Sequence, residues 1–523
     1  MQARRLPAIV VFAMLAMLVL APMAGLLNLA SLPGYEAGDL RFWESAYMRR
    51  VLFFSLWQAL LSTLLSVIPA VLVARAFALQ QNLPLRGFLL RLFAVPLVVP
   101  AVVAVMAVVS VYGSDGWLPL GRSLYGLNGI LLAHVFFNLP LAVRLLLPQW
   151  QAIPQRHWML AENLGMNSWQ RWRFIEWPML REALPGVMLL VFMLCLTSFA
   201  VVLTLGGGPR STTLEVAIYQ SLRFDFDPAR AVVLALLQLA LCVLVAVATL
   251  KLQRLPEVEI NETTAPTPPS TLHRFVDIAL ILAAAIYVGM PLLSVLLDAL
   301  GGPLWSVLGS ASLWRAIANS LLIGLSAAAF AVTAGWFLLC YSAALAQAGG
   351  TRSARLVELA GSIVYVVPPL VIGTGMFVLL SPHVDVFDWV FPVVIAINAL
   401  MGLPFVIRSL GPALRRNHAR YDRLCQSIAL RGWQRFRLLE WPLLRRPLGL
   451  AFALVTVLAM GDLGVIALFG SPETATLSLL IYQQLGAYLI PQATVTALVL
   501  LLLCLAFFAA LERVIGGRDD AQD

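Results

Sequence analysis

Apolar runs long enough to cross a bilayer follow one another along almost the entire chain, and they constrain its fold more than any other feature. Hydrophobic residues make up 61% of the sequence and charged residues 12%, about half the charged share of an ordinary soluble domain. One hydrophobic core does not grow to 523 residues in water, whereas a bilayer solvates apolar faces directly. The composition therefore excludes an ordinary soluble enzyme, a disordered chain and a disulfide scaffold, and it predicts an all-α membrane protein.

Twelve of these runs reach the spanning length of about 20 residues, which predicts twelve transmembrane helices. They lie at residues 7–30, 51–74, 88–113, 125–147, 184–205, 231–250, 275–298, 316–342, 357–381, 389–410, 448–470 and 493–511. Arg4 and Arg5 precede the first run, and no small-residue cleavage pattern leading into a soluble domain follows it. We therefore expect a retained helix rather than a cleaved signal.

Positive charge is concentrated in two loops. The loop after the fourth run carries four arginines and the loop after the tenth carries nine, whereas segments 382–388 and 471–492 contain neither Lys nor Arg. By the positive-inside rule both basic loops and both termini are expected in the cytoplasm of a multi-pass inner-membrane protein. The excess of 35 Lys and Arg over 26 Asp and Glu is thus topogenic, and no nucleic-acid partner is expected.

The two basic loops are copies of each other. Trp169–Arg181 aligns with Trp433–Arg445 at an offset of 264, and nine of the thirteen positions are identical. Further downstream, Ile218-Tyr219-Gln220 matches Ile481-Tyr482-Gln483 at an offset of 263. Six spans per copy give both copies the same orientation in the membrane. The sequence therefore predicts two parallel six-helix repeats, related by a pseudo-twofold axis along the membrane normal, with a pathway between them.

The duplication also sets the expected domain boundaries. The first half is residues 1–251, with a core at about 51–251, and the second is residues 275–523, with a core at about 316–511. Residues 252–274 are polar and rich in proline, and they are expected to form a cytoplasmic linker.

An amphipathic stretch at about residues 155–175 interleaves Trp and Arg and is expected to end at Pro178, because proline cannot continue a helix. Such an element is typical of an interfacial anchor or of a helix that docks in a partner's groove. Docking is favoured because the element recurs in the second half, where Pro442 is expected to end it as Pro178 ends the first. Its apolar anchors would be Trp169 and Trp433, and both copies carry Glu-Trp-Pro, with the glutamates at Glu176 and Glu440.

These loops resemble the coupling loops of the fused membrane subunits of binding-protein-dependent ABC importers. In that family each loop has Glu-Ala-Ala, three residues, Gly and a later Pro, and it forms a coupling helix in a groove of one ATPase subunit. The resemblance implies a type I ABC importer permease fold. The motif falls on Met159, Leu160, Ala161, Gly165 and Pro178 in the first loop and on Arg423, Leu424, Cys425, Ala429 and Pro442 in the second. The sequence departs from it at the Glu, which is Met159 or Arg423, and at the second Gly, which is Ala429.

Within that family the chain is most similar to thiamine-transporting permeases, over nearly its whole length. The likeness is carried by residues 131–140, 206–209, 218–220, 224–230, 461–462 and 481–484. It implies import of thiamine and its phosphates, with two ABC ATPase subunits on the cytoplasmic side and a periplasmic thiamine-binding protein outside. A fused ferric-iron permease, which shares the six-plus-six plan, is the nearest alternative. A proton-coupled secondary transporter is disfavoured, because it normally carries several intramembrane carboxylates.

The chain has no nucleotide site of its own. A Walker A loop needs Gly-Lys-Ser/Thr, whereas the only lysine, Lys251, follows Leu250 at the end of an apolar run. ATP hydrolysis must therefore come from a separate partner subunit, and the chain itself is not an enzyme. No catalytic residue or cofactor is expected. No metal site is expected either, since the five cysteines are far apart and show no metal-ligand spacing.

Polar residues inside the spans are candidates for the substrate pathway, because a charge deep in a span costs about 2.5–3.5 kcal/mol. Asp462 in the eleventh run is either a counter-ion for a thiazolium cation or a cap or bridge between helices. His134 and its equivalent Asn398 are either hydrogen-bonding partners in helix packing or ligand contacts. Tyr219 and Tyr482, at equivalent positions of the repeats, are further candidates.

One loop on the expected outer side combines charge with aromatic rings. Asp225 and Asp227 alternate with Phe224 and Phe226, a pattern that can attract an organic cation or dock the binding protein. A solvated loop without either role is the alternative.

Overall fold

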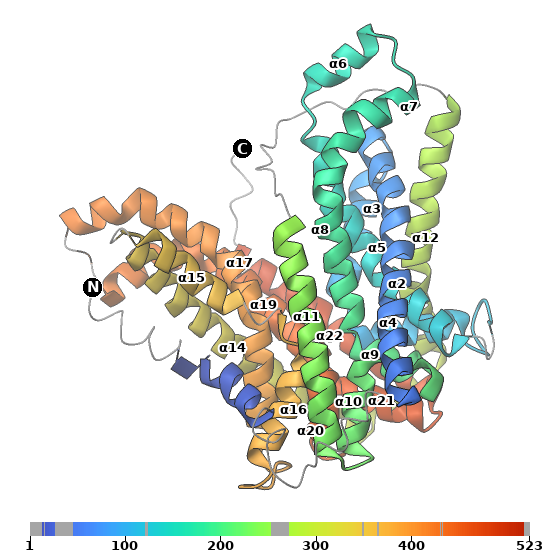
Figure 1. Ribbon diagram of the computed structural model, residues 1–523, viewed down its shortest axis with the longest axis vertical. Helices are drawn as coiled ribbons and strands as arrows, with labels where there is room; N and C mark the ends of the chain where they lie inside the picture. The colour runs from blue at the N-terminus through green and yellow to red at the C-terminus, as the bar shows by residue number, and fades with distance from the viewer. Residues whose placement is uncertain are drawn as a thin grey trace. The chain divides into compact units, whose positions relative to one another are not determined.

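The computed structural model describes residues 13–14, 16–26, 45–120, 124–252, 271–347, 350–362, 366–428, 430 and 432–516. Within these residues the chain is helical and has no strand, as Figure 1 shows. The α-helices are α2 (Ala46–Leu79), α3 (Arg86–Leu92), α4 (Ala101–Tyr112), α5 (Leu127–Gln151), α6 (Gln155–Asn163), α7 (Ser168–Arg171), α8 (Trp177–Leu196), α9 (Phe199–Leu205), α10 (Leu214–Arg223), α11 (Pro228–Leu252), α12 (Thr271–Gly301), α13 (Leu304–Leu308), α14 (Ala311–Gln347), α15 (Thr351–Ser362), α16 (Pro369–Leu380), α17 (Val390–Ser427), α18 (Gly432–Arg435), α19 (Trp441–Gly461), α20 (Gly464–Phe469), α21 (Leu477–Gly486) and α22 (Ile490–Gly516).

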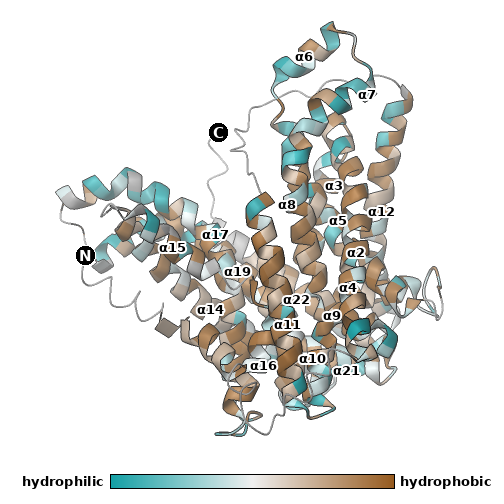
Figure 2. Ribbon diagram, viewed as in Figure 1, coloured by the Kyte–Doolittle hydropathy of each residue, from teal (hydrophilic) through white to brown (hydrophobic). Residues whose placement is uncertain are grey.

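Nine helical segments of the described chain are long and apolar enough to cross a membrane. They are Ala46–Leu79, Leu127–Gln151, Ser168–Leu196, Pro228–Leu252, Leu272–Gly301, Ala311–Ala346, Val390–His418, Phe436–Phe469 and Ile490–Ala510. Each falls on a predicted run, which confirms nine of the twelve. Figure 2 shows hydrophobic residues along these long helices and hydrophilic residues over much of α6.

The three remaining runs are shorter or broken. The first contains an apolar helix at Ala16–Leu26, and the third is a pair of helical pieces, Arg86–Leu97 and Ala101–Tyr112, bent by 113°. Counting the bent pair as one span gives ten, so the number twelve stays a prediction. The ninth run is divided between α15 and α16.

The breaks in the third and ninth runs have the same cause. Pro100 precedes α4 and Pro368 precedes α16, each after Val-Val and each with extended backbone at ψ 143°. Proline lacks an N–H and disfavours helical backbone in the residue before it, so a helix restarts rather than continues at this point. The two new helices are both twelve residues long.

The described residues group into two compact units. The N-terminal unit comprises Leu40–Ala217 and Ala240–Gly302, and the C-terminal unit comprises Met1–Asp39, Ile218–Leu239 and Pro303–Asp523. These units differ from a simple division at residues 252–274 because the first helix of each half packs with the other half's core. In the N-terminal unit α12 packs against α4, and in the C-terminal unit Pro22 lies against Gly375 of α16, which corresponds to α4.

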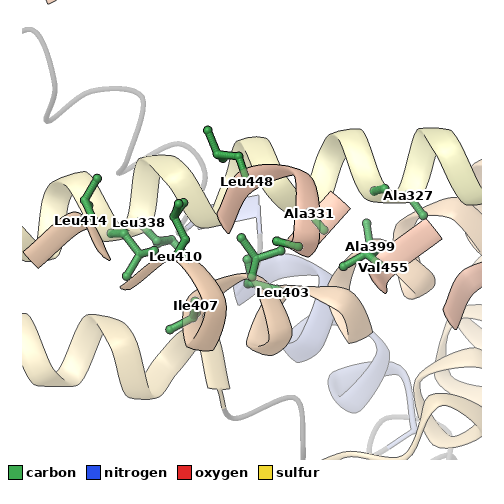
Figure 3. Packing of buried hydrophobic residues seen from close by; sticks show 14 of the residues in the cluster. Ala327, Ala331, Leu338, Ala399, Leu403, Ile407, Leu410, Leu414, Leu448 and Val455 are labelled. Atoms are coloured by element: carbon green, nitrogen blue, oxygen red, sulfur yellow. The ribbon is translucent and has the colours of Figure 1, made fainter. Parts of the chain in front are cut away.

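The core of the C-terminal unit lies between α14, α17 and α19, which pack against one another (Figure 3). Alanine is frequent at the contact, and Ala327, Ala331 and Ala399 are among the buried residues shown there. Gly402 on α17 leaves no room for a side chain, since an added Cβ would overlap the side chain of Val455 on α19. Small residues allow close helix approach, which is the main source of helix association in a bilayer, where apolar burial alone gives little.

Candidate functional site

The first basic loop forms a separate short helix. Pro154 precedes α6 with extended backbone, and the helix then buries Trp158 and Ala161 while Met159 and Leu160 remain 53% and 55% exposed. Gly165 ends the helix at φ +61°. Its N–H bonds Glu162 O at 3.0 Å, and Met166 N–H bonds Ala161 O at 2.9 Å. This is a Schellman ending, which glycine favours because it lacks a Cβ.

The second basic loop presents the equivalent residues on the end of a longer helix. His418 stands at the position of Pro154, so α17 continues without a break to Ser427. Cys425, the equivalent of Ala161, is buried, whereas Arg423 is exposed and Leu424 is 54% exposed. Leu430 N–H bonds Cys425 O at 2.8 Å, which repeats the contact between Met166 and Ala161. Ala429 and the side chain of Trp433 lie outside the described residues.

Apolar side chains at equivalent positions of the two loops are exposed. Leu160 corresponds to Leu424, and Leu164, which is 69% exposed, corresponds to Ile428, which is 60% exposed. Trp169 in the first loop is 65% exposed. A repeated pair of this kind is typical of a surface that binds a partner.

The expectation that Pro178 and Pro442 end the loop helices is wrong. A five-residue π turn, Trp172–Glu176 or Phe436–Glu440, leads directly into α8 or α19, and the proline lies in the first turn of that helix. Trp177 N–H bonds Trp172 O, five residues back, and Trp441 N–H bonds Phe436 O in the same way. The widened turn suits a residue that cannot donate an N–H.

The two glutamates that recur in the loops, Glu176 and Glu440, face inward. Glu176 is 1% exposed and accepts hydrogen bonds from Arg75 Nε at 2.6 Å, Arg75 Nη2 at 3.0 Å and Trp150 Nε1 at 3.0 Å. Glu440 is 2% exposed and accepts from Arg435 Nε at 2.8 Å. Arg435 also pairs with Asp422 at 2.5 Å. The chain itself therefore supplies partners for both carboxylates.

His134 belongs to a buried polar cluster in the N-terminal unit. Its Nδ1 lies 2.8 Å from Ser62 Oγ, and on the same helix Asn138 Nδ2 lies 3.2 Å from Cys195 Sγ. Gln58 Nε2 donates to the Cys195 carbonyl at 2.9 Å. In the second half, the positions of Gln58, Ser62 and Asn138 are occupied by Ile323, Ala327 and Gly402. The first repeat thus has a polar helix contact where the second has a small-residue contact.

Asp462 lies at the break between α19 and α20, and both of its carboxylate oxygens accept hydrogen bonds. Its Oδ1 accepts the N–H of Gly464 at 3.1 Å, and its Oδ2 accepts the N–H of Val465 at 3.3 Å and Asn398 Nδ2 at 3.4 Å. Asn398 donates also to Val394 O at 3.0 Å. The carboxylate therefore caps α20 and links it to α17.

Tyr219 and Tyr482 lie on the short helices α10 and α21, and both belong to the C-terminal unit. Tyr219 is 4% exposed, and its ring meets that of Phe224 edge to face, with 5.7 Å between the centroids. Burial raises the pKa of the Tyr219 phenol to about 12. The structure thus places these two pathway candidates in the same compact unit.

The start of each short helix is held by a serine from the first core helix of its half. Ser55 Oγ on α2 accepts the N–H of Leu214 at 2.9 Å, and Ser320 Oγ on α14 accepts the N–H of Leu477 at 2.8 Å. Sequence reasoning missed both serines. Their spacing of 265, close to the offset of the other matches, was the available signal.

Glu215 on α10 was also missed. It is 1% exposed, and burial raises the pKa of its carboxyl to about 8. A single glutamate in a short amphipathic segment carries no sequence signal for burial.

The aromatic outer loop is partly tied down. Asp225 Oδ2 lies 3.4 Å from Arg230 Nη1, and Asp227 Oδ1 accepts the N–H of Arg230 at 3.0 Å, so that it caps α11. Phe226 is 81% exposed, with φ +51°. The Phe226 ring is therefore the most exposed side chain of this loop, whereas the Phe224 ring packs against Tyr219.

Long apolar helices in two matching sets, each with a basic loop that exposes apolar side chains, define a duplicated integral membrane permease. The family model "Binding-protein-dependent transport system inner membrane component" matches residues 70–255 and again residues 337–516. The chain belongs to this family, and the double match confirms the predicted duplication.

The chain is similar to several thiamine transport system permease proteins. The one from Brucella abortus (strain 2308) is 44% identical over 521 residues, covering 97% of this chain and 95% of the relative. The one from Escherichia coli (strain K12) is 44% identical over 488 residues, covering 91% and 90%. The one from Haemophilus influenzae is 39% identical over 474 residues, covering 88% of each. No solved structure matches the chain.

Proposed function

We propose that the chain is the membrane-spanning permease of an ABC importer that carries thiamine, and its phosphates, across the inner membrane. The observation that carries this proposal is identity of 44% with a thiamine transport system permease protein over 97% of the chain. Identity at that level spans both repeats, so it includes the loops and the outer segments as well as the spans. The permease supplies the passage and does not hydrolyse ATP.

The energy would come from two copies of an ABC ATPase subunit, one on each basic loop. Support comes from the exposed apolar pairs at equivalent positions, Leu160 with Leu424 and Leu164 with Ile428. The density of arginine in both loops favours a cytoplasmic location for them and for both termini. Met159 and Trp169 extend the contact in the first loop.

Glu176 and Glu440 would act on coupling indirectly. Because both carboxylates are buried and bonded within the chain, they hold each loop to its transmembrane helices. A push on α6, or on the end of α17, would then move α8 or α19 as a rigid body, and the two repeats would rock between inward and outward access. On the outer side, a periplasmic thiamine-binding protein would dock near Phe224–Asp227.

Reconstitution tests the proposal directly. The chain is incorporated in liposomes with its ATPase and its binding protein, and uptake of labelled thiamine is compared with uptake of ferric iron. We expect thiamine uptake that requires ATP and the binding protein and that persists with a protonophore. Iron uptake in place of thiamine uptake, or thiamine uptake that the protonophore abolishes without ATP dependence, would contradict it.

A further inference from the structure

The second basic loop begins on an extension of α17 beyond the apolar core of the C-terminal unit. The buried cluster between α14, α17 and α19 includes Leu414 but no later residue of α17. Leu424, which the proposed function places against the ATPase, follows ten residues later, about 15 Å along the helix at 1.5 Å per residue. This core therefore ends well before the part of α17 that a partner would push, and other contacts must hold that end.

Arg435 joins this end of α17 to the turn before α19. Its Nη2 lies 2.5 Å from Asp422 Oδ1 and 3.1 Å from His418 Nδ1, two residues that are one turn apart on α17. Its Nε donates to Glu440 Oε1 at 2.8 Å, in the π turn that leads into α19. His418 Nδ1 also lies 3.1 Å from Asp422 Oδ2. One guanidinium therefore binds groups on both sides of the loop, and we call these four residues the Arg435 bridge.

The Arg435 bridge is largely shielded from water. None of its four side chains is more than 14% exposed. Salt screens charges that water does not reach much less than exposed ones, and the planar guanidinium fixes the direction of each bond it donates. The connection between α17 and the π turn is therefore firmer than an ion pair on the surface would make it.

The first basic loop is built without such a bridge. Pro154 and Trp158 stand at the positions of the two bridge residues of α17, and neither side chain can accept a hydrogen bond from an arginine. Arg171, the counterpart of Arg435, donates instead to Met166 O at 3.1 Å within its own loop. Among the described residues, the connection from the loop back to the preceding helix through this arginine is thus confined to the second repeat.

We propose that Arg435 is a positioning residue for coupling, which transmits the movement of the ATPase from the end of α17 to α19 and gives the second basic loop a connection that the first lacks. The inference rests on the proposed function, because it requires an ATPase at Leu424. Coupling is carried by contiguous networks of side-chain bonds between elements that move together. Without the Arg435 bridge, the end of α17 would yield to the ATPase while α19 stayed in place.

A variant without charges separates coupling from stability. Arg435→Met alone leaves two shielded carboxylates without their arginine, so Arg435→Met/Asp422→Asn/Glu440→Gln is used instead. It is reconstituted with the ATPase and the binding protein, and thiamine uptake is measured per ATP hydrolysed. We expect thermal unfolding and ATPase co-purification near the wild type and a fall in uptake per ATP of about 2- to 30-fold, the range for a coupling residue that contacts no ligand.

Two other results of this experiment would overturn the proposal. Uptake per ATP at the wild-type value would show that the Arg435 bridge transmits nothing. A variant that unfolds more readily and also loses the ATPase would show that the role is merely structural.

Two single variants are the matched controls. Arg171→Met removes the equivalent arginine of the first loop, and Arg415→Met removes an ion pair with Glu358 from the same helix α17, in which Arg415 is 55% exposed. Both are expected to leave uptake per ATP unchanged, because neither touches the Arg435 bridge and exposed pairs contribute little. A loss in Arg171→Met as large as in the triple variant would contradict the difference between the two loops.

Amide hydrogen exchange gives a measurement that does not depend on the cargo. In the complex with the ATPase, residues 418–428 are expected to exchange faster in the triple variant than in the wild type, while α6 exchanges at the same rate in both. Unchanged exchange at 418–428 would overturn the proposal. A wild-type protein that imports no thiamine would contradict the proposed function instead, and the exchange result would still show whether the Arg435 bridge holds the end of α17.

Discussion

Arg75 and Glu176 form an ion pair with two hydrogen bonds, 2.6 Å from Nε to Oε2 and 3.0 Å from Nη2 to Oε1. The pair joins α2 to the π turn before α8, and Trp150 at the end of α5 adds a third bond. Three helices of the N-terminal unit therefore meet on one carboxylate. Since that carboxylate lies directly after the first basic loop, the pair fixes the loop to the transmembrane helices.

Arg75→Met is expected to destabilise the protein and to loosen the first loop. Glu176 is 1% exposed, so its charge would be left buried, with Trp150 as its one remaining donor among the described residues. The expected loss is about 3 kcal/mol, the low end for a broken buried pair, because Arg75 is 19% exposed. Thermal unfolding of the purified protein measures the loss of stability. Co-purification of the ATPase measures whether the loosened first loop still binds its partner.

The double variant Arg75→Met/Glu176→Gln is the control, because it removes both charges. It is expected to recover much of the stability, since an apolar or neutral replacement of both partners is often close to neutral. A double variant as unstable as Arg75→Met would show that the lost hydrogen bonds, rather than an unpaired charge, cause most of the destabilisation.

Leu160→Asp and Leu424→Asp are each expected to weaken ATPase binding at one loop, and together to abolish it. Both leucines are more than half exposed, so the chain should fold normally, while a charge in an apolar contact is costly for the complex. Co-purification of the tagged ATPase gives the stoichiometry. Asn163→Asp, an equal charge change at the exposed end of α6, is expected to leave binding intact. ATPase retained at the wild-type ratio in the double variant would refute the docking surfaces.

Ser55→Ala and Ser320→Ala are each expected to lower stability by about 1–3 kcal/mol, because each leaves the first N–H of a short buried helix without its acceptor. The two losses should add, since the serines have no shared partner. Ser294→Ala is the matched control, because that buried serine donates to a carbonyl of its own helix, Pro291 O, at 2.8 Å and anchors no second helix among the described residues. The measurement is thermal unfolding, and a Ser294→Ala loss as large as the other two would contradict the anchoring role.

The spans and the duplication follow from the sequence because both depend on local pattern. Apolar runs and repeated motifs need no knowledge of the fold, and nine of the twelve runs are confirmed as long apolar helices in the described residues. The break in the third run also had a sequence signal in its prolines. The role of Pro178 could not be read from the sequence, because the π turn before it creates a position where a proline fits.

The partners of the loop glutamates could not be predicted either. Arg75 is 101 residues from Glu176, and the repeat does not help, since Cys340 stands at the equivalent position in the second half. In the second half Arg435 pairs with Glu440 instead. Arg171, the first-half counterpart of Arg435, donates to Met166 O at 3.1 Å. Each repeat thus pairs its buried glutamate with an arginine from a different position, and only the three-dimensional packing shows which arginine it is.

Asp462 is expected to act as a helix cap rather than as a counter-ion, because its two oxygens already accept from Gly464, Val465 and Asn398. Asn keeps one acceptor oxygen and can still cap the helix, so Asp462→Asn should keep the KM for thiamine near wild type and lose less stability than Asp462→Ala, which should cost about 0.5–2 kcal/mol. Thermal unfolding and uptake kinetics of both variants separate the roles, since a counter-ion would lose its function with the charge. A rise in KM of tenfold or more in Asp462→Asn, with unchanged unfolding, would assign the residue to the cation instead.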